Sequence, residues 1–119
     1  MSSDPSVTPA PEPPPVPTIH EAERASGPSG AVLWGAEIDF AAAVARRQAG
    51  VDVVVRGDDI DVNRRLALQI ESAVGPALRG VPHRFTAGPL ALPHFQQVTP
   101  PPDGHTFPET DRRKARKKP

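Results

Sequence analysis

Histidine is the residue type whose number and spacing in this chain could do chemistry. Three of the four histidines, His83, His94 and His105, stand eleven positions apart. Each follows a proline or a glycine, which favours a loop or the end of a strand. Imidazole changes its charge near neutral pH, so such a group suits proton transfer or metal binding. The alternative is that all three histidines are structural.

The neighbours of these histidines favour acid–base chemistry over metal binding. No HxH or HxxxH pair is present to hold zinc, whereas Arg84 adjoins His83 and Thr106 adjoins His105. Two imidazoles and a guanidinium suffice to cleave RNA through its own 2′-hydroxyl. One imidazole removes the hydroxyl proton, the other protonates the leaving 5′-oxygen, and the guanidinium offsets charge on the phosphate. Two of the three histidines would then form the acid–base pair, with Arg84 as the phosphate stabiliser and no metal or cofactor.

A helix–strand–helix unit should form the framework for these side chains. The sequence predicts a helix over 36–48, a strand over 51–56 with three consecutive valines, and a second helix over 60–74 that ends at Gly75-Pro76. Apolar residues at helical spacing predict the buried stripe of each helix. These residues are Ile38, Ala41, Ala42 and Ala45 in the first helix, and Val62, Leu66, Ile70, Ala73 and Val74 in the second.

Short strands should follow the second helix. The segments 90–98 and 105–107 are predicted strands, and Pro93 places the first at a sheet edge or a bulge. Their expected core residues are Leu90, Leu92, Phe95 and Phe107. The short apolar run 31–34 is either a further strand or the entry to the domain. The predicted fold class is therefore α+β, with two N-terminal helices around a strand, then a small antiparallel sheet of short strands.

Composition divides the chain into three parts. Seven prolines fall within the first seventeen residues, so 1–30 is predicted to be a disordered proline-rich segment, followed by a compact domain over 31–108. There is no cysteine, which excludes disulfides and cysteine-rich metal sites. No signal peptide or membrane segment is recognisable, so we expect no membrane partner and a cytoplasmic location. Export by a specialised secretion system, without a Sec signal, is the alternative.

The charge of the chain is strongly asymmetric, although its formal net charge is zero. Residues 1–61 hold ten acidic side chains and four arginines, whereas 62–119 holds four acidic and ten basic side chains. The segment 109–119 is predicted to be a disordered basic tail. Its basic residues, which could bind nucleic acid through phosphates, are Arg112, Arg113, Lys114, Arg116, Lys117 and Lys118. The alternative is a solvated charge run without a partner.

Two short motifs resemble a known group of proteins. The run AGPLALPHFQ over 87–96, followed by GHTF over 104–107, is similar to the C-terminal effector domains of bacterial polymorphic toxins. Many such domains are metal-independent ribonucleases of the barnase/EndoU/RelE-like fold. The resemblance implicates His94 and His105, and His83 less firmly. It departs at Gln96, where a further histidine is frequent, and at Pro108, where a tyrosine or a similar residue would be expected.

These observations lead to one main functional hypothesis and two alternatives. The main hypothesis is a toxin-like bacterial domain that binds RNA and cleaves it without a metal, with a cognate immunity protein as a further expected partner. The first alternative is a noncatalytic interaction module that uses the basic tail and the proline-rich head. The second is a structural protein. The enzyme hypothesis requires the histidines to converge in space, whereas the two alternatives do not.

Overall fold

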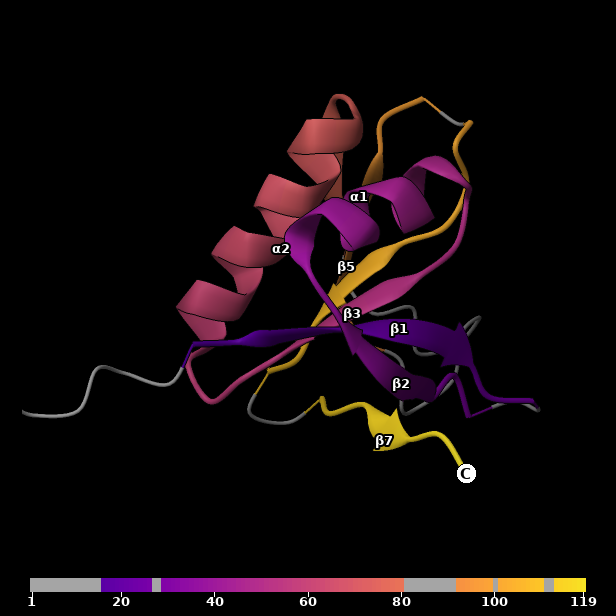
Figure 1. Ribbon diagram of the computed structural model, residues 1–119, viewed down its shortest axis with the longest axis vertical. Helices are drawn as coiled ribbons and strands as arrows, with labels where there is room; N and C mark the ends of the chain where they lie inside the picture. The colour runs from indigo at the N-terminus through magenta and orange to yellow at the C-terminus, as the bar shows by residue number, and fades with distance from the viewer. Residues whose placement is uncertain (1–15, 27–28, 81–91, 100, 111–112) are drawn as a thin grey trace, which may run out of the picture.

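The structure is a single mixed sheet with two helices on one side. The computed structural model describes residues 16–26, 29–80, 92–99, 101–110 and 113–119. Figure 1 shows the elements in their order along the chain, which is β1 (Thr18–Arg24), β2 (Val32–Ile38), α1 (Phe40–Gln48), β3 (Val53–Arg56), α2 (Ile60–Val74), β4 (Ala77–Gly80), β5 (His94–Gln97), β6 (Thr106–Pro108) and β7 (Arg116–Lys117). The predicted α+β class is confirmed, and so is the helix–strand–helix order of α1, β3 and α2. The first helix begins at Phe40 and not at residue 36, because Asp39 caps its start and Ile38 ends β2.

The predicted details of the sheet are partly wrong. The strand order is β4-β5-β6-β3-β1-β2-β7, and β1 and β2 come before the helices in sequence. The sheet is mixed and not antiparallel throughout, because β3 pairs in parallel with β6, and β2 with β7. A parallel pair needs a long connection, and α2 with β4 and β5 provides it between β3 and β6.

The folded domain begins within the segment that was predicted to be a disordered head. β1 lies in the middle of the sheet and pairs with both β2 and β3. Its buried residues are only Ile19, His20 and Ala22, so its apolar signal is weak beside the prolines that precede it. Those prolines, over 1–15, lie outside the described residues.

The fold also extends into the predicted basic tail. Glu109 is buried, and its Oε2 accepts a hydrogen bond from the backbone N–H of Ala115 at 2.6 Å. β7 follows and pairs with β2, and the N–H of Lys118 donates to the carbonyl of Trp34 at 2.9 Å. The prediction of a wholly disordered tail is therefore wrong.

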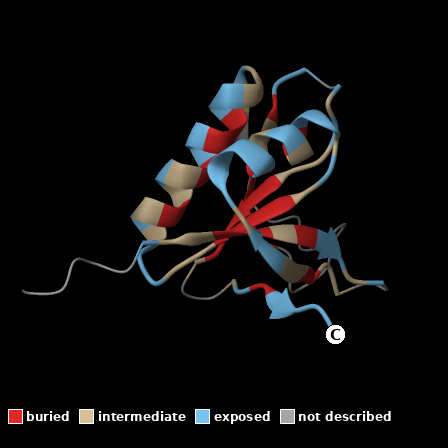
Figure 2. Cartoon of the chain, viewed as in Figure 1, coloured by how far each residue is buried: buried red, intermediate tan, exposed pale blue. Residues whose placement is uncertain are grey.

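The sheet has one buried cluster on each face. On the helix side, Ile19, Val53, Val55, Ala67, Ile70 and Phe95 pack together with Ala43. The opposite face, here called the helix-free face, carries Ala22, Val32, Val54, Leu92, Phe107 and Ala115, with Trp34 packed against them. Figure 2 shows the buried central strands between the helices and the more exposed β2 and β7. Leu92, Phe95 and Phe107 are thus core residues as predicted, whereas Leu90 lies outside the described residues.

The buried faces of both helices include polar side chains, which the apolar stripes did not predict. In α1 the buried residues are Ala43 and Arg47, whereas Ala41, Ala42 and Ala45 are exposed. In α2 they are Asn63, Ala67, Ile70 and Glu71, so Ile70 alone of the predicted stripe is fully buried. The stripes failed because Arg47, Asn63 and Glu71 are buried together with their hydrogen-bond partners. No helix in the described ranges is long and apolar enough to cross a membrane.

Candidate functional site

Four polar side chains from distant parts of the sequence meet on the helix-free face. Arg24 ends β1, Asp52 precedes β3, His105 precedes β6, and His94 begins β5. The register explains the meeting, because Thr106 of β6 pairs with Phe95 of β5 on one side and with Val53 of β3 on the other. Asp52, His94 and His105 each precede one of these paired residues. Their side chains therefore point to the opposite side of the sheet, which is the helix-free face. We call Arg24, Asp52, His94 and His105 the histidine cluster.

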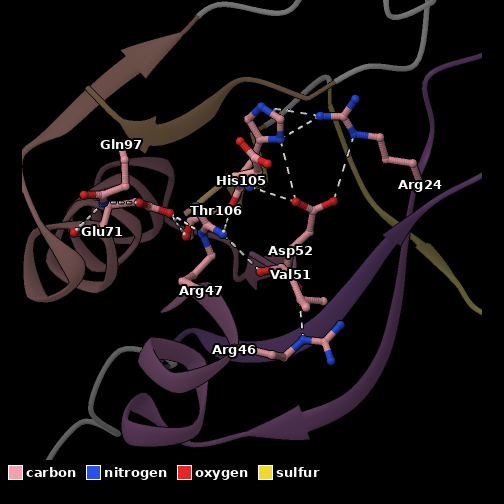
Figure 3. Close-up of polar contacts among 10 residues, drawn as sticks. Arg24, Arg46, Arg47, Val51, Asp52, Glu71, Gln97, His105 and Thr106 are labelled. Carbon is pink, nitrogen blue, oxygen red and sulfur yellow. Dashed lines mark hydrogen bonds and ion pairs between the residues drawn. The ribbon is translucent and has the colours of Figure 1, made fainter. Parts of the chain in front are cut away.

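Asp52 holds His105 at both its backbone and its ring. Oδ1 of Asp52 accepts a hydrogen bond from the backbone N–H of His105 at 2.8 Å and lies 3.7 Å from Nδ1 of the ring (Figure 3). Burial acts to raise the pKa of Asp52, but the hydrogen bonds from His105 and the charges of His105 and Arg24 outweigh it, so the pKa lies below its ordinary value. Asp52 is therefore a carboxylate at neutral pH and fixes the orientation of the imidazole.

Arg24 contacts the same imidazole. Its Nη2 lies 2.6 Å from Nδ1 of His105, and its Nε lies 4.0 Å from Oδ2 of Asp52 (Figure 3). A guanidinium N–H donates only to an unprotonated ring nitrogen, so this contact suits the neutral imidazole with its proton on Nε2. The carboxylate of Asp52 suits the protonated ring instead. Arg24 and Asp52 therefore both contact the imidazole of His105.

His94 packs against His105 from β5. The two ring centroids lie 4.6 Å apart with the planes at 71°, and both rings contact Phe107. His94 is 7% exposed, whereas the side chain of His105 is 21% exposed and that of Arg24 is 52% exposed. A ligand approaching from solvent would therefore meet Arg24 and His105 before His94.

A pocket opens beside His105. It has a volume of about 260 Å³, and its lining residues are Gln96, Gln97, Pro102, Asp103, Gly104 and His105. Of the histidine cluster, His105 alone lines this pocket.

A buried ionic network on the other side of the sheet supports the two loops that carry Asp52 and His105. Nε of Arg47 donates to Oε1 of Glu71, and Nη1 of Arg47 donates to the carbonyls of Val51 and Asp103 at 3.2 and 2.7 Å (Figure 3). Val51 directly precedes Asp52, and Asp103 lies two residues before His105. Arg47 therefore joins these two loops through their backbone.

Thr106 belongs to this buried network and not to the exposed side of the histidine cluster. Its hydroxyl donates to Oε1 of Glu71 at 2.8 Å, and the side-chain amide of Gln97 donates to Oε2 at 2.6 Å. Thr106 is fully buried on the helix side, so its position suits support of the site and not contact with a ligand.

The structure thus brings together part of the predicted site. His94 and His105 converge, whereas His83, Arg84 and Arg112 lie outside the described residues. Lys114, Arg116, Lys117 and Lys118 are exposed, and Arg113 is partly buried. Sequence reasoning missed Arg24 and Asp52, because each is far from the histidines in the chain. The one available signal was the position of Asp52 at the start of the valine-rich strand.

Comparison with known proteins gives no relative. No protein-family model matches the chain, and neither a curated protein nor a solved structure matches it significantly.

Proposed function

We propose that the protein is a toxin-like, metal-independent endoribonuclease whose reaction centre is the histidine cluster. The observation that carries this proposal is the convergence on His105, where a second imidazole, a carboxylate and a half-exposed guanidinium all lie in contact range. Separate structural roles for these four side chains would not require them to meet, whereas proton transfer beside a bound phosphate does.

The proposed reaction transfers a phosphoryl group within the RNA. The 2′-hydroxyl loses its proton to one imidazole, and its oxygen attacks the adjacent phosphorus. The bond from phosphorus to the 5′-oxygen breaks, and that oxygen takes a proton from the other imidazole. The products are a 2′,3′-cyclic phosphate and a 5′-hydroxyl, so no external reactant is needed. Arg24 offsets the negative charge that builds up on the phosphate.

The residues of the cluster have distinct parts in this proposal. His105 exchanges protons with the substrate, because it is the more exposed imidazole and lines the pocket. His94 is the second acid–base group, in contact with His105. Arg24 takes the role that the sequence suggested for Arg84, and Asp52 orients His105. The motif resemblance to polymorphic toxin effectors supports RNA as the substrate and a cognate immunity protein as a partner.

The test is an assay on a pool of single-stranded RNA at neutral pH with EDTA. We expect fragments that end in a 2′,3′-cyclic phosphate, because the 2′-hydroxyl is the nucleophile. A DNA pool of the same sequences should stay intact, since it lacks this hydroxyl. If micromolar protein leaves the RNA intact, the ribonuclease proposal is wrong.

A noncatalytic interaction module is the second candidate. The exposed basic residues of β7 at the edge of the sheet favour it, because they could contact a polyanion without any chemistry. Binding of RNA without cleavage in the same assay would select this candidate.

A further inference from the structure

The partly exposed Trp34 lies among cationic side chains on the helix-free face. The guanidinium carbon of Arg56 lies 4.1 Å from the centroid of the Trp34 ring, and Nζ of Lys117 lies 6.0 Å from it. His20 meets the ring at a centroid distance of 5.0 Å in an edge-on arrangement. We call Trp34, Arg56 and Lys117 the Trp34 platform.

The Trp34 platform and the histidine cluster lie on the same face of the sheet. Trp34 packs against the helix-free cluster, which includes Phe107, and Phe107 contacts both His94 and His105. Phe107 lies on β6 and Trp34 on β2. The sheet order between these strands is β6-β3-β1-β2, so they are three strand spacings, or roughly 14 Å, apart. Arg24 lies between, on β1, two residues after the Ala22 that pairs with Trp34.

The charged groups of the Trp34 platform that face solvent, those of Arg56 and Lys117, are positive. Arg56 forms an ion pair with Glu109 at 3.3 Å, but Glu109 is buried and Arg56 is 32% exposed, so the guanidinium is the group that faces solvent. Lys117 is exposed and makes no ion pair with any described residue. The neighbouring Lys118 points to the other side of β7, where it pairs with Glu23 at 3.1 Å.

We propose that the Trp34 platform binds a base and a flanking phosphate of a single-stranded nucleic acid. Aromatic rings and guanidinium planes stack on bases of any sequence, and adjacent cations pair with the phosphates. That the bound nucleic acid is RNA rests on the proposed function, whereas the argument for the binding surface itself does not.

The chain offers a direct probe of this surface. Trp34 is the only tryptophan and there is no tyrosine, so the intrinsic emission reports on position 34 alone. The ligand is a single-stranded oligodeoxynucleotide of about ten nucleotides, a length within the usual site sizes. It lacks the 2′-hydroxyl and cannot be cleaved by the proposed reaction. We expect saturable quenching of Trp34, with the same dissociation constant as the anisotropy of a labelled oligonucleotide.

Two matched substitutions distinguish the contribution of the Trp34 platform to binding from that of the net charge of the protein. Lys117→Gln and Lys118→Gln remove one positive charge each, from the last residue of β7 and from the residue that follows it. We expect Lys117→Gln to weaken binding several-fold and Lys118→Gln to change it by less than about twofold. Trp34→Ala should weaken binding about tenfold or more in the anisotropy assay, and Trp34→Phe should restore most of it by keeping a stacking ring. Circular dichroism and thermal melts of each variant show that it is folded.

Several results would overturn the proposal. They are an absence of oligonucleotide binding, binding without quenching, and equal losses for Lys117→Gln and Lys118→Gln. These outcomes are independent of the ribonuclease proposal. Quenching by the oligodeoxynucleotide without any RNA cleavage leaves the platform standing and removes the enzyme. RNA cleavage without quenching leaves the enzyme and removes the platform.

Discussion

Arg47 of α1 and Glu71 of α2 form an ion pair in which neither side chain has any exposed surface. Glu71 also accepts hydrogen bonds from Thr106 and Gln97, so both of its oxygens are occupied. The pair joins the two helices to each other and to the loops before β3 and β6. One nitrogen of Arg47, Nη2, is buried without a hydrogen bond to the described residues. Through Arg47, this pair is hydrogen-bonded to the loops that carry Asp52 and His105.

Breaking the pair on one side should destabilise the domain strongly. Glu71→Gln leaves the guanidinium of Arg47 buried without a counter-charge, and we expect the free energy of unfolding to fall by about 3–5 kcal/mol. Urea melts measure this loss. The double variant Arg47→Met with Glu71→Leu removes both charges, so its loss should be smaller than the sum of the single losses. Glu23→Gln, which breaks the half-exposed pair with Lys118, is the control and should change stability little. An equally small effect of Glu71→Gln would contradict the account.

Gly104 should tolerate alanine less well than Gly50. Both glycines have positive φ, 93° and 79°, so alanine is strained at either position. A Cβ at Gly104 would also lie 2.6 Å from Nη1 of Arg47 and 3.1 Å from Oδ1 of Asp52, whereas at Gly50 the nearest atoms are 3.8 Å away. We expect Gly104→Ala to lose more stability in urea melts and to shift the NMR signals of the His105 ring. Equal losses, with unchanged His105 signals in both variants, would show that the space around Gly104 is not restrictive.

Asp52 should make stability depend on pH at the acidic end. Its pKa in the folded protein is lowered from the ordinary value of 3.8, so the folded state favours the carboxylate. The stability from this group is therefore present above that ordinary value and is lost as the pH falls through the lower folded pKa. The difference in unfolding free energy between wild type and Asp52→Asn should be constant near neutral pH and should shrink below about pH 4. Urea melts from about pH 2 to pH 7 test this, and a difference that grows on acidification would contradict the sign of the shift.

The local elements could be predicted from the sequence because their signals are local. The helix over 60–74 was predicted with its observed bounds, since Asp59 caps its start and Gly75 follows its end. β1 was missed because it has few apolar residues, and its stability comes from pairing with β2 and β3 on both sides. The parallel pairing of β3 with β6 also depends on tertiary structure.

The candidate site could likewise be predicted only where its signals are local in the sequence. The spacing singled out three histidines, the motif resemblance pointed to His94 and His105 among them, and the structure places these two rings in contact. Arg24 lies 81 residues before its partner His105, and no sequence pattern links two residues at that separation. Arg47 and Glu71 look like exposed helix residues in the sequence, because only the folded structure brings opposite charges together in the core.

The most direct test of the central claim is the single-turnover rate of RNA cleavage, with EDTA present, for wild type, His94→Ala, His105→Ala and the double variant. If the two imidazoles are an acid–base pair, each single substitution should lower the rate by about 10²-fold or more with folding unchanged. The double variant should lose much less than the product of the two, because paired groups act as a unit. Wild-type protein that does not cleave RNA, or folded single variants that retain the wild-type rate, would contradict the claim.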